Sequence, residues 1–198
     1  MEAKLLLVPW FVTVLYSSIP LFWFAIHPFA GRWQTMKRSP YRALLPLWLL
    51  IIVALGGITW PWRLHQLYSF PAMWLPLLAL LVLAFVTYPR MSQDFGPRRI
   101  SGEAELRPRE HEQELVMTGL HARMRHPIYV THLFNMAAWT LVSGLAVSFV
   151  LLAVSVLITY PIMIAIEERE LEQRFGKSFR DYKSRVPIFP FPFLRASR

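Results

Sequence analysis

Four long apolar segments dominate the hydrophobic pattern of the chain. They lie at about residues 5–26, 43–61, 69–88 and 127–166. A helix of about 20 mostly apolar residues crosses the roughly 30 Å of hydrocarbon in a bilayer. The last segment is close to twice that length, and Ser143 and Gly144 near its middle favour a tight turn between two helices. The pattern therefore predicts an all-α integral membrane protein with five transmembrane helices.

The positively charged residues predict the orientation of these spans. Nineteen of the 21 Lys and Arg residues lie in three polar stretches, at residues 27–42, 89–126 and 167–198. Only Lys4 and Arg63 lie elsewhere. Because positively charged loops resist translocation, we expect the N-terminus outside and the C-terminus in the cytoplasm, in a bacterial inner membrane or an endoplasmic-reticulum-type membrane. An odd number of spans agrees with this and puts the two large polar segments in one compartment.

Composition supports a single membrane domain. Hydrophobic residues make up 55% of the chain and charged residues 17%, which leaves too little polar surface for a soluble domain of 198 residues. The chain has no cysteine, which excludes thiolate catalysis and thiolate metal sites. The net charge is +9, but the basic residues that produce it flank the long apolar runs, so we expect no nucleic-acid partner. Residues 1–198 then form one domain, with three spans in residues 1–88 and a functional half in residues 89–198.

The C-terminal polar segment begins as an amphipathic helix. Its apolar residues recur at spacings of three or four, at Leu171, Phe175, Phe179, Tyr182 and Val186. Such a helix is expected to lie along the membrane surface, with a break at Gly176. The tail carries Pro187, Pro190 and Pro192, cannot continue as a helix and is predicted to fold back as an extended cover.

Two polar clusters at the ends of the last two predicted spans are candidates for chemistry. Arg125 and His126 precede the fourth span and Tyr129 lies in its first turn, while Glu167 and Glu168 follow the fifth. Ionisable groups at a membrane boundary are costly unless they are paired or bind something. The alternatives are interfacial anchors for the first cluster and, for the second, a solvated helix face that pairs with neighbouring arginines.

The two clusters are more informative together, because a hairpin of spans four and five returns Glu167 to the depth and side of His126. The predicted pocket is formed by the loop before span four, the hairpin, the amphipathic helix and the tail. Carboxylates and aromatic rings in such a pocket could hold an organic cation. The spacings of His121, His126 and His132 are not those of a helical metal pair, so we expect no metal site.

The order of these motifs resembles the isoprenylcysteine carboxyl methyltransferases and the related phospholipid and thiol methyltransferases of membranes. The resemblance covers about residues 94–190. The motifs are Asp94-Phe95-Gly96, Leu115-Val116, Gly119, Arg125-His126-Pro127-x-Tyr129, Glu167-Glu168, Phe175-Gly176, Tyr182 and Val186-Pro187. None of the eight glycines forms the Gly-x-Gly-x-x-Gly fingerprint of a soluble dinucleotide site, which leaves a membrane-type cofactor pocket.

The resemblance implies transfer of a methyl group from S-adenosyl-L-methionine to a lipophilic acceptor in the membrane, leaving S-adenosyl-L-homocysteine. The residues that would bind the cofactor are Leu115, Val116, His121, His126, Pro127, Ile128, Tyr129 and Glu167. Acceptor positioning or proton removal would fall to Arg125, Glu168 or His121. The partners are then the lipid bilayer and a lipid or lipidated substrate, while the oligomeric state is not encoded in any motif.

Two residues depart from the pattern of the carboxyl methyltransferases. His121 stands where the family usually has a tyrosine, and it still offers a ring and a hydrogen-bond donor. Met163 stands where those enzymes have an arginine that pairs with the substrate carboxylate, and a thioether cannot do so. The carboxylate acceptor is therefore less favoured than the cofactor site, and a phospholipid amine or a thiol is the alternative.

Two further functions compete with methyl transfer. A membrane reductase of the sterol type has a similar His-Pro turn and binds NADPH, but Ile128, Val130 and Thr131 differ from the residues expected there. A non-catalytic membrane scaffold or a small transporter is the other. Against transport, the first three predicted spans carry no ionisable residue near their centres.

Overall fold

The structure is a computed structural model that describes residues 3–70, 75–83, 85–86, 106 and 114–189. Within these ranges every regular element is helical, apart from an isolated antiparallel bridge between Gln66 and Leu145. The longer helices are α1 (Ala3–Phe24), α2 (Ala30–Gln34), α3 (Tyr41–Thr59), α6 (Pro127–Ser143), α7 (Ala146–Val154), α8 (Tyr160–Phe175) and α9 (Lys177–Arg185). Short turns form η1 (His27–Phe29), η2 (Trp60–Trp62), η4 (Gly119–Ala122) and the π-helix η5 (Ser155–Thr159). The predicted all-α class is confirmed for this part of the chain.

Three continuous helical stretches are long and apolar enough to cross a membrane. They are Lys4–Gln34, Tyr41–Trp62 and Ala146–Phe175. The predicted fourth span corresponds to α6, which has 17 residues and therefore a length of about 25 Å, slightly less than the hydrocarbon thickness. Residues 75–83 and 85–86 are helical and belong to the predicted third span, whose other residues lie outside the described ranges. Five spans thus remain a prediction.

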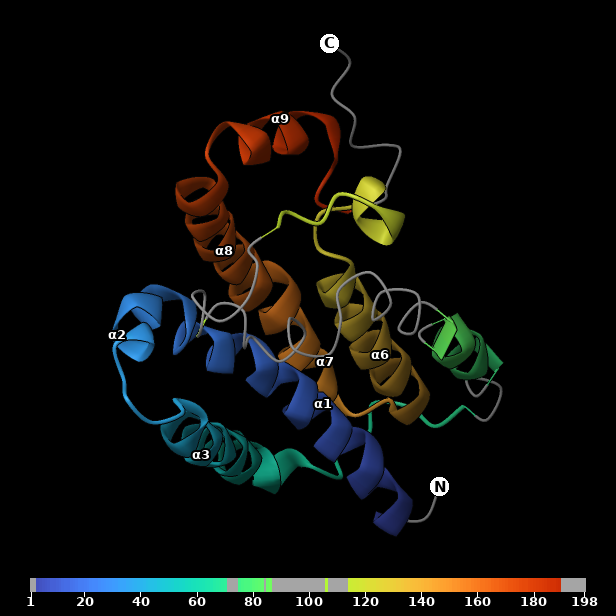
Figure 1. The fold of residues 1–198 in the computed structure, drawn as a ribbon. Helices are drawn as coiled ribbons and strands as arrows, with labels where there is room; N and C mark the ends of the chain where they lie inside the picture. Colours follow the sequence, from blue (N-terminus) through green and yellow to red (C-terminus); the bar gives the residue numbers. More distant parts are fainter. Residues whose placement is uncertain (1–2, 71–74, 84, 87–105, 107–113, 190–198) are drawn as a thin grey trace.

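Helix α1 lies at the centre of the bundle, against α3, α6 and α7 (Figure 1). Small hydroxyl side chains tie it to its neighbours. The Trp10 ring nitrogen donates to the Thr59 hydroxyl at 3.0 Å, and the hydroxyls of Thr13 and Ser148 are 3.0 Å apart. In an apolar surrounding such bonds satisfy groups that lipid cannot, and they fix how the helices face one another.

The predicted turn at Ser143 and Gly144 is confirmed. Gly144 ends α6 with φ of +64°, a left-handed backbone conformation that residues other than glycine rarely adopt. Its carbonyl accepts a bond of 2.8 Å from the Leu67 nitrogen, which brings the chain after η2 against the turn. A Cβ at Gly144 would lie 2.3 Å from the Tyr68 carbonyl oxygen. The turn reverses the chain and sets α6 antiparallel to α7 and α8.

Replacing Gly144 by Ala is expected to lower the stability of the protein in detergent by about 2 kcal/mol or more, because both the positive φ and the Tyr68 carbonyl oppose a methyl group. Thermal unfolding measures the change. Gly57→Ala is the matched control, since a Cβ there meets nothing within 4 Å and alanine favours the helix. An equal loss of stability in both variants would contradict the steric argument.

Candidate functional site

The hairpin brings the start of α6 beside the polar end of α8 (Figure 1). The Nδ1 atom of His126 lies 3.5 Å from a carboxylate oxygen of Glu167, and its Nε2 atom lies 3.2 Å from Glu168. Local sequence explains the approach on both sides. Pro127 begins α6, where its missing N–H costs nothing, and the apolar run of α8 ends at Ile166. The predicted proximity of His126 and Glu167 is confirmed.

Arg125 connects the two helices to the C-terminal segment. Its Nε atom donates to Glu168 at 2.8 Å, and one terminal nitrogen donates to the carbonyls of Lys183 and Val186. Its backbone nitrogen donates to the carbonyl of Pro187 at 2.9 Å. Because the Arg125 side chain is buried, the interpretation as an interfacial anchor does not hold. This arginine therefore holds the segment after α9 against the site.

Glu168 is surrounded by positive charge. Its carboxylate lies 2.8 Å from Arg125, 2.7 Å from the Lys183 ammonium and 3.2 Å from His126, and its side chain is 7% exposed. The solvated-face interpretation therefore does not hold for Glu168. It does describe Glu170, which forms an i,i+4 ion pair with Arg174 on the same helix. A buried carboxylate with three such partners holds helices together and has little freedom to take part in proton transfer.

Glu167 is the more accessible of the two carboxylates. Its side chain is 24% exposed, and it accepts a bond of 2.6 Å from the Tyr129 hydroxyl. The rings of His126 and Tyr129 stack beside it, with centroids 5.4 Å apart and planes 8° from parallel. A carboxylate next to an aromatic ring can receive a cation, through its charge and through the face of the Tyr129 ring.

His126 precedes α6 and is positively charged at neutral pH. Burial opposes that charge, but the carboxylates of Glu167 and Glu168 outweigh burial and raise the pKa of His126 to about 9. In the unfolded chain an ordinary histidine titrates near 6.5. The charge on His126 therefore contributes to stability below about pH 6.5, and this contribution declines as the pH rises to about 9.

Thermal unfolding between pH 6 and pH 10 measures this contribution. We expect the midpoint to fall by several degrees between about pH 6.5 and pH 9, and to fall less in His126→Gln, which cannot gain a proton. A midpoint that rises with pH in this range, or the same decline in both proteins, would contradict the assignment of the charge to His126.

The other residues predicted for the site lie around this cluster. His121 is buried in η4, and its carbonyl accepts a bond of 2.7 Å from the Tyr182 hydroxyl of α9. Burial raises the pKa of Tyr182 to about 12, so that hydroxyl keeps its proton and donates. Leu115 and Val116 are half-buried in the irregular stretch before η4, and Ile128 lies in the first turn of α6. Their roles in cofactor binding stay predictions.

The tail returns to the site as predicted, as far as it is described. Ile188 and Phe189 pack against a buried cluster that contains Tyr129, Tyr160 and Met163. Gly176 separates α8 from α9, which confirms the predicted break, and Phe179 and Tyr182 are the buried residues of α9. Pro190 and Pro192, like the motif Asp94-Phe95-Gly96, lie outside the described residues.

Two ionic contacts near the site were not predicted from the sequence. Lys183 reaches Glu168 from α9, and His27, in η1, pairs with Glu170 of α8. The ring of Trp23 stacks on His27 with centroids 5.1 Å apart. Both contacts join residues that are distant in the chain. The histidine at the end of the first apolar run was the available signal for the second contact.

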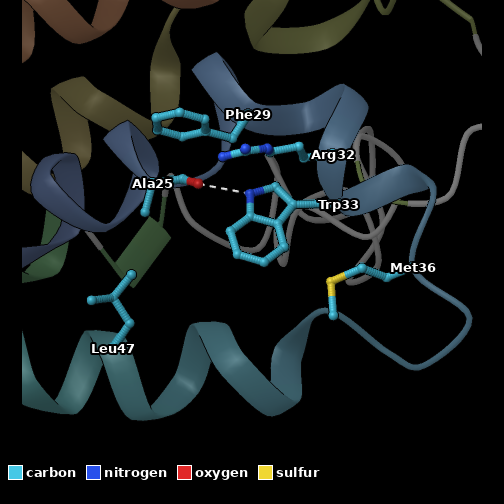
Figure 2. Close-up of a pocket in the computed structure, with 6 residues that line it drawn as sticks. All are labelled: Ala25, Phe29, Arg32, Trp33, Met36 and Leu47. Carbon is cyan, nitrogen blue, oxygen red and sulfur yellow. Dashed lines mark hydrogen bonds between the residues drawn. The ribbon is translucent and has the colours of Figure 1, made fainter.

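A cavity of about 490 Å³ lies between the segment that contains η1 and α2 and helix α3. Figure 2 shows the Trp33 indole, whose nitrogen donates to the Ala25 carbonyl at 2.7 Å, with Phe29 and Arg32 on one side and Leu47 on the other. The six lining residues include one cation and no carboxylate or histidine. This cavity therefore lacks a negative charge that could attract a positively charged ligand, and the His126 cluster is the better candidate site.

Comparison with known protein families gives a match to the part of the chain that contains this site. Residues 106–178 match the phospholipid methyltransferase family. The resemblance to these methyltransferases is thereby shown. The matched segment contains η4, the α6–α8 hairpin, Arg125, His126, Tyr129 and both glutamates. No curated protein and no solved structure matches the chain. Among the described residues no group of three or more His, Asp or Glu side chains is arranged to hold a metal ion.

Proposed function

We propose that this protein transfers a methyl group from S-adenosyl-L-methionine to a lipophilic acceptor that reaches the site from the bilayer. One observation carries the proposal: Glu167, an accessible carboxylate beside two stacked rings, stands at the end of an apolar helix within the segment that matches methyltransferases. The predicted cytoplasmic orientation would give the site access to a water-soluble methyl donor.

The residues at the site suit such a donor. S-adenosyl-L-methionine carries a sulfonium and an ammonium, and when bound it supplies an electrophilic methyl group. Glu167 offers the negative charge for one of these cations, and the Tyr129 ring offers an aromatic face. Pro127 and Ile128, in the first turn of α6, and Leu115, Val116 and His121, in the stretch before it, are the other residues that would hold the cofactor.

The remaining polar residues build the walls of the site. Arg125, Glu168 and Lys183 fasten the segment after α9 across the end of the hairpin, and Ile188 and Phe189 cover the apolar cluster below. A methyl transfer needs mainly alignment of donor and acceptor and the exclusion of water. The contacts of Arg125 and Glu168 thus support positioning through the tail in preference to direct proton removal.

On these grounds the methyl acceptor is proposed to be an amine or a thiol in preference to a carboxylate. Met163 is fully buried in the cluster with Tyr129 and Tyr160, where a carboxylate would need a cation. Methyl transfer to a carboxylate, as in the isoprenylcysteine enzymes, would require that cation from elsewhere.

Isothermal titration of the detergent-purified protein tests the proposal. We expect S-adenosyl-L-homocysteine to bind with a micromolar dissociation constant and NADPH to give no heat of binding. Binding of NADPH alone would favour a membrane reductase, and no binding of either nucleotide would favour a scaffold. Both results would contradict methyl transfer.

A further inference from the structure

Several buried side-chain polar atoms have no hydrogen-bond partner among the described residues, and two of them belong to rings inside the helix bundle. These two are the hydroxyl of Tyr160 and the Nδ1 atom of His132. Tyr160 is 1% exposed, so water does not reach most of its side chain. An unsatisfied buried group costs about 1–3 kcal/mol, and phenylalanine at position 160 would avoid that cost. Such groups in a dry interior call for a ligand or a catalytic role.

Both residues lie deeper in the bundle than Glu167, along facing helix stripes. Tyr129, His132 and Met136 share a face of α6 because their spacings are three and four. Tyr160 and Met163 share a face of α8 with Glu167 for the same reason. Tyr129 joins the two stripes, since its hydroxyl bonds to Glu167 and its ring lies 5.3 Å from that of Tyr160.

Helix α1 closes the third side of this region. The ring of Tyr16 lies 5.3 Å from that of His132, and Tyr16 also packs against the cluster that contains Tyr160. The two unpartnered groups therefore border one buried region shared by α1, α6 and α8. This region begins directly below the carboxylate proposed to hold the methyl donor.

The local backbone sets the direction of Tyr160. The π-helix Ser155–Thr159 immediately precedes it. Each residue added to a helical turn rotates the following side chains by about 100°, so this irregular turn determines that Tyr160 faces Tyr129. Pro161 supplies one cause, because it has no N–H to continue the regular ladder. Short π-helices of this kind occur frequently at functional sites.

The surroundings of these groups select against an anionic acceptor. The buried side chains beside Tyr160 are Tyr129, Met136, Met163 and Ile164. None of them carries a positive charge, so a carboxylate or a phosphate brought to this depth would be an unpaired buried anion, which is strongly unfavourable. An uncharged X–H group of low polarity, in contrast, would satisfy both unpartnered atoms, because it would donate to Nδ1 of His132 while its lone pair accepts from the Tyr160 hydroxyl.

We propose that Tyr160 and His132 bind the reacting end of the methyl acceptor, and that this end is an uncharged nucleophile with an X–H bond, of which a lipophilic thiol is the simplest example. This inference rests on the methyltransferase function proposed above. The acceptor passes its X–H proton to Nδ1 of His132, its lone pair forms the bond to the methyl carbon, and the electron pair of the broken carbon–sulfur bond stays on the donor sulfur. Tyr160 donates a hydrogen bond that orients the nucleophile.

The variants Tyr160→Phe and His132→Phe test the assignment in the full-length protein. We expect both to bind S-adenosyl-L-homocysteine as the wild type does. His132→Phe should lower the rate of methylation of 1-decanethiol by a factor of about a hundred or more, the range of a lost general base, and Tyr160→Phe by a factor of about ten, the range of a lost hydrogen bond. Tyr160→Phe should also unfold at the same temperature or higher, because its hydroxyl has no partner to lose. Wild-type rates in both variants would overturn the proposal.

A second readout does not depend on turnover. In the presence of S-adenosyl-L-homocysteine, 1-decanethiol should raise the unfolding temperature of the wild type and leave that of the two variants unchanged. Tyr68→Phe is the control, since its hydroxyl donates to the Leu141 carbonyl at 2.6 Å far along α6 and its loss should not alter thiol binding. Equal stabilisation of all the proteins would place the thiol elsewhere.

The acceptor class is tested by comparing 1-decanethiol with decanoic acid at matched concentration. Methylation of the thiol and not of the acid is the expected result, and methylation of the acid alone would overturn the proposed class. The outcomes also separate the two proposals. Failure of every protein to bind S-adenosyl-L-homocysteine would remove the proposed function, whereas normal binding with unchanged methylation in the variants would remove only the acceptor site.

Discussion

Glu167→Gln is expected to weaken the binding of S-adenosyl-L-methionine while the protein stays folded. Glutamine has the shape of glutamate and can still accept the bond from Tyr129, but it lacks the charge that would hold a cation. Loss of a charge-assisted hydrogen bond of about 1.5–3 kcal/mol corresponds to a dissociation constant raised about tenfold to a hundredfold. Titration calorimetry measures the affinity, and thermal unfolding checks the fold.

S-adenosyl-L-homocysteine serves as an internal comparison, because it keeps the ammonium but lacks the sulfonium. A smaller loss of affinity for it than for S-adenosyl-L-methionine would assign Glu167 to the sulfonium, and an equal loss would assign it to the ammonium. Glu172→Gln is the matched protein control. Its carboxylate lies on the same helix and pairs with Arg180 at 3.5 Å, with both side chains well exposed. We expect it to bind both nucleotides normally. Unchanged affinity in Glu167→Gln, or an equal loss in Glu172→Gln, would remove Glu167 from the binding site.

Arg125→Met is expected to reduce the stability of the protein by about 3–5 kcal/mol, the range found when one partner of a buried ion pair is removed. The substitution takes one of three cations from Glu168, the one that is itself buried, and removes the donors that hold the Lys183 and Val186 carbonyls. The segment after α9 should then separate from the hairpin. Equilibrium unfolding measures the stability, and limited proteolysis near residues 183–189 measures the separation.

Two further variants make this prediction specific. Arg180→Met removes an exposed arginine of α9 whose ion pair should contribute less than about 1 kcal/mol. The double variant Arg125→Met with Glu168→Leu removes both buried charges and should be more stable than Arg125→Met alone. If the single variant unfolds like the wild type, Arg125 does not hold the tail.

The turns of the chain were predictable from the sequence because they depend on local chemistry. Gly144 and Gly176 both have positive φ, the conformation for which glycine is the least costly residue. The hairpin followed from the length of the fourth apolar segment. Once the hairpin is given, the approach of His126 and Glu167 follows from the similar lengths of its two arms.

Contacts that depend on the rotation of one helix against another were not predictable. The sequence indicates that α9 is amphipathic, but it does not say that Lys183 reaches Glu168. The same holds for His27 and Glu170, which are 143 residues apart. The π-helix before Tyr160 is a backbone response to Pro161 and to packing, and a regular helical periodicity cannot reveal it.

Transfer of a radioactive methyl group tests the central claim most directly. The purified protein, reconstituted in bilayers made from a total lipid extract of its host, would be incubated with S-adenosyl-L-methionine labelled in the methyl group. We expect label to enter the organic-solvent extract with the wild type and far less label with Glu167→Gln. No transfer above a protein-free control, from wild-type protein that binds the donor, would contradict the proposal that this hairpin site methylates a lipophilic acceptor.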